Sequence, residues 1–190
     1  MSDIGHNRGP AMDHGIAWRR HCWKKARADL LPHLPIEILR TRVRRAAELG
    51  LPYKTYASVR AASGHDVVAF LFSSNALRAF KNHPELAADR AQKLAALRNC
   101  GGIALVTKPL TPQTMRAANP HTRLIFAEAP DGLASWPDCA RAITLTLRAQ
   151  NLPRDGVVLI GDTTLERDWS TAGRLAGYLS AEKYFVAPDS

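Results

Sequence analysis

Polar residues follow four short apolar runs of this 190-residue sequence, and their side chains could bind a phosphate or another small ligand. Hydroxyl and ammonium groups suit an anion, and helix N-termini would add backbone amides that attract one. If the runs are parallel strands, their carboxyl ends lie at one edge of a sheet, where ligands of such sheets bind. The residues of this candidate ligand site, each with the run it follows, are Ser73 and Ser74 (67–72), Lys108 (103–106), Glu128 (124–127), and Asp162 and Thr163 (157–160).

Positive charge is a second chemical signal, and it is concentrated in the first third of the chain. The formal net charge is +9, and residues 1–60 hold 12 Lys or Arg against 5 Asp or Glu. Residues 61–190 hold 14 against 12, so they are nearly neutral. Such asymmetry is expected of a module that contacts a polyanion. Basicity that serves only solubility is the alternative.

The segment 42–61 has the residue types of a tight helical hairpin. Ala46 permits close approach of a second helix, and Gly50 tolerates the left-handed backbone that ends a first one. Tyr56 and Val59 are three residues apart, so they lie on one face and can pack on Leu49. This segment resembles the helix-turn-helix of bacterial DNA-binding regulators.

The resemblance implies that the second helix, residues 54–62, enters the major groove of double-stranded DNA. Hydroxyl and amine groups would reach base edges, and arginines would contact phosphates. Five phosphate contacts would give a salt slope of about −4.5. The residues implied in DNA contact are Arg42, Arg44, Arg45, Lys54, Thr55, Ser58 and Arg60.

Two residues depart from the helix-turn-helix pattern. Arg45 stands where the family usually has an apolar residue, and Pro52 stiffens the turn. An ordinary helical hairpin with a solvated basic face is therefore the alternative interpretation of this segment.

A fainter resemblance lies near the end of the chain. The segment 157–177 resembles the final acidic motif of haloacid-dehalogenase-like phosphatases, in which an apolar strand ends in Gly-Asp and a small-residue helix follows. It implies Asp162 and Asp168 as carboxylates on the magnesium side. Ser73 or Ser74 and then Lys108 follow the order of that family's phosphate-binding residues.

That family's nucleophile is missing from this sequence. It is an aspartate directly after an early strand, in an Asp-x-Asp pattern, whereas Asp66 precedes its apolar run. Without a nucleophile no aspartyl-phosphate can form, so we assign no catalytic residue. Thr163 with Glu166 also has the spacing of a helix capping box, which explains these polar residues at least as well as catalysis does.

The elements expected to position these residues alternate between strand and helix after Gly64. The four apolar runs predict strands, and helical segments are expected between and after them. Continuous apolar strands are typical of a parallel sheet covered on both faces. We therefore predict an α/β fold, a short parallel Rossmann-like sheet flanked by helices. Before Gly64 the expected helical segments are 16–31, 36–49 and 54–62, and after it they are 75–99 (in two pieces), 112–118, 137–150 and 165–182.

These elements suggest three parts: a flexible tail (1–15), a basic helical region (16–64) and a Rossmann-like domain (65–190). With 46% hydrophobic and 23% charged residues, the chain has the composition of a globular protein. Its apolar runs are far shorter than the ~20 residues that span a bilayer, so we expect no membrane partner. The three cysteines are scattered, which fits a reducing cytoplasm and predicts no metal site.

Together these observations favour a DNA-binding protein, a possible transcriptional regulator, over an enzyme. We expect no cofactor, and a homodimer fits because such helices usually read two half-sites. The α/β domain would bind a ligand, mediate dimerisation or act as a scaffold. The alternative is an α/β enzyme or small-molecule binder with its site at the strand carboxyl ends, and a third possibility is a module that binds an acidic protein.

Overall fold

The structure is a computed structural model, and it describes residues 34–186. The expected tail 1–15 and the start of the basic helical region lie outside the described residues. The chain divides into two compact units, 1–39 and 40–190, and both buried hydrophobic clusters lie within the second.

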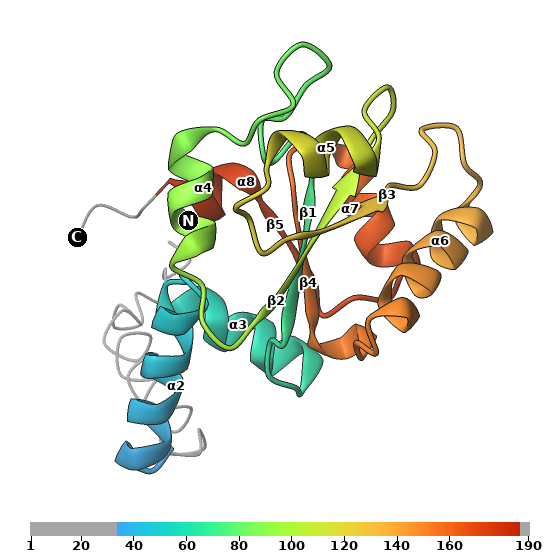
Figure 1. Ribbon diagram of the computed structural model, residues 1–190. Coiled ribbons are helices and arrows are strands. Elements are labelled where there is room, and N and C mark those ends of the chain that lie inside the picture. The colour runs from blue at the N-terminus through green and yellow to red at the C-terminus, as the bar shows by residue number, and fades with distance from the viewer. Residues whose placement is uncertain (1–33, 187–190) are drawn as a thin grey trace, which may run out of the picture. The chain divides into compact units, whose positions relative to one another are not determined.

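A five-stranded parallel sheet forms the centre of this unit (Figure 1). Its order is β3-β2-β1-β4-β5, so β1 lies in the middle and the chain builds outward from it in both directions. All four strand pairs are parallel, which confirms the predicted α/β, Rossmann-like class. The strands are β1 (Ala69–Ser73), β2 (Gly101–Val106), β3 (Ile125–Glu128), β4 (Val157–Gly161) and β5 (Gly177–Ser180).

Helices cover both faces of the sheet. Along β1, Phe70 and Phe72 belong to one buried cluster, to which α2, α3, α5 and α8 contribute. Leu71 belongs to the cluster on the other face, which α6 and α7 cover. Alternate residues of a strand face opposite sides, so a run that is apolar throughout needs helices on both. The helices are α2 (Ile36–Glu48), α3 (Tyr53–Ser63), α4 (Ala88–Ala95), α5 (Pro112–Ala118), α6 (Trp136–Ala149), α7 (Thr164–Ala172) and α8 (Ala181–Phe185).

Side-chain caps fix where several helices begin. Thr111 precedes α5 and Ser135 precedes α6, and each accepts a hydrogen bond from the backbone N–H three residues later. Thr163 and Glu166 form the predicted capping box of α7. None of the helices within residues 34–186 is long and apolar enough to cross a membrane.

The C-terminal helix expected over 165–182 is wrong. Helix α7 ends at Ala172, and Gly177–Ser180 forms the fifth strand before α8 begins. Arg174 adopts a positive φ of 51° just after Gly173, which stops the helix. The strand was missed because β5 is a short edge strand of half-buried residues, not an apolar run.

The first helical piece expected after β1 is also wrong. Within 75–99 only α4 is helical, and residues 74–78 form a turn. Arg78 has a φ of 54°, which breaks a right-handed helix, and Phe80 pairs with His83 in an isolated bridge. Alanine and leucine in this stretch serve as turn residues buried against the core rather than as helix formers.

Candidate functional site

The turn between α2 and α3 has the geometry expected at Gly50. This residue has a φ of 62°, and the N–H of Leu51 donates to the carbonyl of Ala46 while that of Gly50 donates to Ala47. This pair of hydrogen bonds is the Schellman ending of a helix, which requires the left-handed conformation that glycine adopts readily. The sequence prediction for this turn is confirmed.

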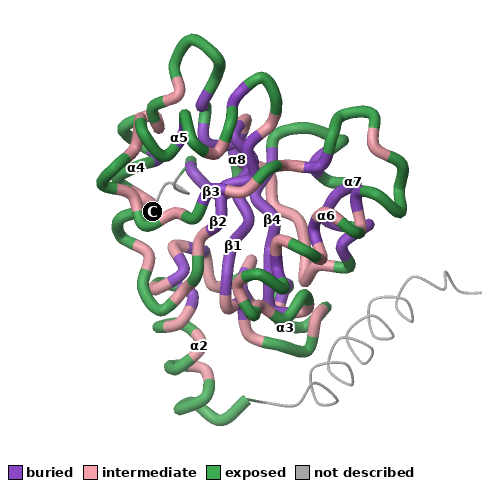
Figure 2. The backbone as a smooth tube through the Cα atoms, turned by 45° about the vertical axis from the view of Figure 1, so that its right-hand side comes forward, coloured by how far each residue is buried: buried purple, intermediate pink, exposed green. Residues whose placement is uncertain are grey.

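One side of the hairpin packs into the domain. Ala46, Leu49, Tyr56 and Val59 are all buried in the cluster that includes Phe70 and Phe72. Both views place α3 at the amino-terminal end of the strands (Figures 1 and 2). The hairpin is therefore a fixed part of the α/β unit.

The opposite side of the hairpin faces solvent. Lys54 and Ser58 are exposed on α3, with Thr55 half-buried beside them. On α2, Arg44 is exposed and Arg42 is half-buried. Figure 2 shows exposed segments on both helices. Within the described part of the chain, Arg42, Arg44 and Lys54 form no ion pair, although the charge of Arg44 contributes to the lowered pKa of Glu48.

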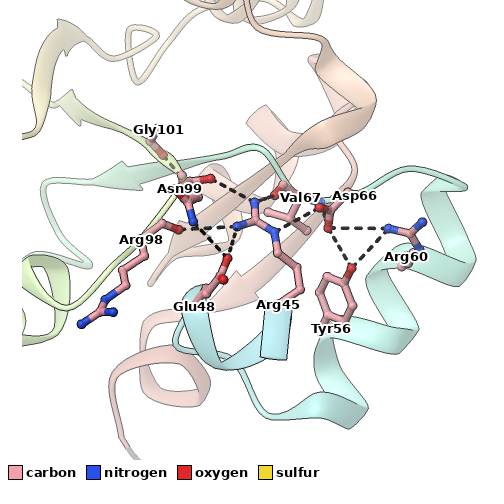
Figure 3. A network of polar contacts seen from close by, with 10 residues as sticks. Arg45, Glu48, Tyr56, Arg60, Asp66, Val67, Arg98, Asn99 and Gly101 are labelled. Atoms are coloured by element: carbon pink, nitrogen blue, oxygen red, sulfur yellow. Dashed lines mark hydrogen bonds and ion pairs between the residues drawn. The ribbon is translucent and has the colours of Figure 1, made fainter. Parts of the chain in front are cut away.

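Arg45 does not belong to that exposed side. Its guanidinium donates to the carbonyls of Val67 (2.8 Å) and Asn99 (3.0 Å), next to the starts of β1 and β2 (Figure 3). It also forms ion pairs with Glu48 (2.9 Å) and Asp66 (3.0 Å), and its side chain is only 16% exposed. Its departure from the helix-turn-helix pattern thus has a structural cause, since it fastens α2 to the sheet.

Arg60 is likewise engaged inside the fold. Its Nη1 donates to the hydroxyl of Tyr56 (3.2 Å) and lies 3.6 Å from an oxygen of Asp66. The Tyr56 hydroxyl in turn donates to Asp66 (2.8 Å). Arg45 and Arg60 therefore share the carboxylate of Asp66. Both side chains are bound within the fold, so neither belongs to the exposed basic surface.

Burial and charge shift the pKa values of this network. Burial raises the pKa of Tyr56, and its hydrogen bond to Asp66 raises it further. Burial alone would lower the pKa of Arg45, but the hydrogen bond to Glu48 and the charge of Asp66 outweigh it, so that the pKa is raised. Both groups keep their protons at physiological pH.

The hydroxyl groups of the candidate ligand residues at the carboxyl edge already form hydrogen bonds within the fold. Ser73 is buried and caps its own turn by accepting from the N–H of Ala76 (3.0 Å). The hydroxyl of Ser74 is 2.6 Å from that of Thr107, which directly follows β2. Thr163 caps α7. The hydroxyls of Ser73, Ser74 and Thr163 therefore stabilise the turns and the helix start that follow the strands.

Glu166 occupies the crevice where strand order reverses, between the ends of β1 and β4. Its side chain is fully buried and accepts from Asn75 Nδ2 (2.8 Å) and from the N–H groups of Asp162 (2.5 Å) and Thr163 (3.0 Å). In parallel sheets this crevice is the usual place of a ligand. Here the carboxylate of Glu166 lies in the crevice and accepts the hydrogen bonds of these three donors.

Lys108 and Glu128 lie apart from this crevice, at the ends of β2 and β3. Lys108 forms an exposed ion pair with Asp131 (2.8 Å). Hydrogen bonding to Asp131 raises the pKa of Lys108, and Glu128 contributes to the same shift through its charge. The six candidate ligand residues therefore divide into two groups.

The carboxylates that the phosphatase resemblance implies do not form an acidic cluster. Asp162 and Asp168 are both exposed, and Asp168 lies toward α6, where its charge adds to the effects of burial and of Asp138 in raising the pKa of Cys139. Within residues 34–186 no group of three or more His, Cys, Asp or Glu is arranged to hold a metal ion.

Sequence reasoning did not identify the buried cation Arg90. It is 4% exposed, pairs with Asp89 (3.2 Å), and its guanidinium lies 4.1 Å from the ring centre of Phe185 on α8. Arginine is common on the exposed faces of helices, so its presence in this segment did not indicate a buried side chain.

Comparisons with protein-family models, with curated proteins and with solved structures found no match to this chain.

Proposed function

We propose that this protein binds double-stranded DNA through the exposed side of the α2–α3 hairpin, as a regulator acting in the cytoplasm. The observation that carries the proposal is the exposure of Lys54 and Ser58 on a helix whose other side is anchored in the domain. A helix that reads a groove must be rigidly mounted and must project polar side chains outward.

The basic residues of the hairpin have two different roles, and this supports the assignment. Arg45 and Arg60 hold the hairpin in place, and Arg42, Arg44 and Lys54 carry the charges that could pair with phosphates. Thr55 and Ser58 would lie between them and the bases, where hydroxyl groups can contact either base edges or phosphates.

Because Arg45 and Arg60 are bound within the fold, the expected salt dependence of DNA binding is weaker. Three phosphate contacts predict a slope of about −2.7 per protomer, instead of the about −4.5 expected from five. A homodimer is the assembly we favour for this function, because paired helices read two half-sites about one helical turn apart.

Neutralising single charges tests this interface. Lys54→Gln and Arg44→Gln should each weaken binding to duplexes of any sequence and reduce the salt slope by about one. Arg148→Gln is the matched control, because Arg148 is an exposed arginine on α6, which covers the other face of the sheet. Fluorescence anisotropy with a labelled duplex measures all three.

The result that would reject the proposal is equally specific. If Arg148→Gln lowers affinity as much as Lys54→Gln and Arg44→Gln do, the charge of the whole protein is responsible rather than the hairpin. Circular dichroism and thermal unfolding of the variants, which change only exposed side chains, check that the fold is retained.

A further inference from the structure

A cavity of about 800 Å³ opens on the side of the sheet that α4 covers. Its walls are α4, the turn 97–102 that leads into β2, and the connection 118–124 between α5 and β3. Pockets that hold small molecules typically measure about 300–1,000 Å³. The candidate ligand residues at the carboxyl edge do not line it.

Leucine side chains form much of the lining of this cavity. Leu86, Leu94, Leu97 and Leu124 line it and pack with their other sides against the buried core. Gly102 of β2 also lines the cavity, and an added Cβ there would come within 2.6 Å of Leu124 Cδ2. The glycine therefore allows Leu124 to pack directly on the sheet.

Cys100 contributes to the apolar wall rather than to chemistry. Burial raises the pKa of its thiol to about 12, so the sulfur is protonated and weakly nucleophilic at physiological pH. The polar residue Asn119 is also occupied, because its amide donates to the carbonyls of Pro84 and Met115 and accepts from the N–H of Leu86. Asn119 thus holds the wall in shape.

The rim of the cavity is positively charged. Arg98, His121 and Arg123 line it and are exposed, and no Asp or Glu is among its described lining residues. Neither arginine side chain forms an ion pair within residues 34–186. A leucine-lined interior with two free guanidinium groups at its mouth complements a molecule with an apolar body and an anionic head.

We propose that this cavity is a binding site for a small amphipathic carboxylate, such as a medium-chain acyl acid. Its hydrocarbon part would contact the four leucines, and its carboxylate would accept hydrogen bonds from Arg98 and Arg123. Arginine suits this role because its planar donors match the two oxygens of a carboxylate. The proposal does not depend on DNA binding.

Isothermal titration calorimetry of the full chain with decanoate, below its micelle concentration, tests the site. Decanoate should bind with a stoichiometry near one, and more tightly than decan-1-ol or decylamine, which share its chain but not its charge. The double variant Arg98→Gln/Arg123→Gln should weaken decanoate binding at least about tenfold, as expected for the loss of a charged hydrogen bond. Binding of decan-1-ol should be unchanged in that variant.

A second variant tests ligand binding in the cavity interior independently of the arginines at the rim. Ala95 is exposed on α4 and lines the cavity, so Ala95→Trp should fill it from the side and abolish binding of both decanoate and decan-1-ol. Arg148→Gln is the control and should bind like the wild type. The proposal is overturned if decanoate does not bind, if decylamine binds as tightly, or if the double arginine variant binds decanoate like the wild type.

Discussion

Polar residues lie at both ends of the parallel sheet, but their side chains are used differently. At the carboxyl end, Ser74 bonds to Thr107, Asn75 bonds to Glu166, and Lys108 pairs with Asp131. At the amino-terminal end, Arg45 is engaged in the same way, but the basic residues on the exposed side of the hairpin and at the mouth of the cavity form no ion pair within the described residues.

This difference shows that polar residue types at the usual ligand-binding edge are weak evidence for a ligand. Short polar side chains after a strand also cap helices and close turns, and they do so here. An unneutralised cation beside an apolar surface is stronger evidence, because the fold itself gives it no partner.

The largest expected effect is at the carboxyl end, in Glu166→Ala. This change removes the acceptor of three donors in a fully buried place, so the free energy of unfolding should fall by about 3 kcal/mol. Glu166→Gln keeps one acceptor oxygen and should lose less. Urea unfolding measures both, and an equal loss would show that the hydrogen bonds kept by the remaining acceptor oxygen contribute nothing to stability.

At the amino-terminal end, Arg45→Met should lower the free energy of unfolding by about 2 kcal/mol. Methionine keeps the apolar stem but leaves the carbonyls of Val67 and Asn99 without their donor. Arg44→Met, on the exposed neighbour, is the control and should leave stability unchanged. If the two variants unfold at the same urea concentration, Arg45 does not fasten the hairpin.

The same variant has a predicted pH dependence. Hydrogen bonding from Arg45, and then from Asn99, lowers the pKa of Glu48 below its ordinary value of 4.5. A lowered carboxyl pKa contributes stability above that value, and this contribution is lost as the pH falls through the folded pKa. The difference in stability between wild type and Arg45→Met should therefore shrink below pH 4.5, and urea unfolding across pH 3–7 would reveal a constant difference if this is incorrect.

The smallest expected effect is at Lys108. Its ion pair with Asp131 joins side chains that are 83% and 52% exposed, so solvent screens the attraction. Lys108→Met should unfold at the same urea concentration as the wild type, within error. A clear loss of stability would mean that the two ends of the sheet differ less than we infer.

The sequence predicted those parts of the molecule that depend on local patterns. The four apolar runs became β1 to β4, and Gly50 and Thr163 mark helix ends as expected. Strand β5 was not predicted, because its residues are half-buried at a sheet edge and carry no apolar run.

The cavity could not be predicted at all. Arg98 and Arg123 are 25 residues apart in the sequence and come together at its rim because β2 and β3 are adjacent strands. The role of Arg45 is of the same kind, since its carbonyl partners at Val67 and Asn99 are distant in sequence from it and from each other. Only the packed sheet brings such residues together.

The most direct test of the central claim is the affinity of the full chain for a labelled duplex between 50 and 200 mM salt, measured by fluorescence anisotropy. We predict binding at the lowest salt and a slope of log affinity against log salt near −2.7 per protomer, set by Arg42, Arg44 and Lys54. The absence of binding at 50 mM salt, or affinity that does not change with salt, would contradict the assignment of the hairpin as a DNA-binding surface.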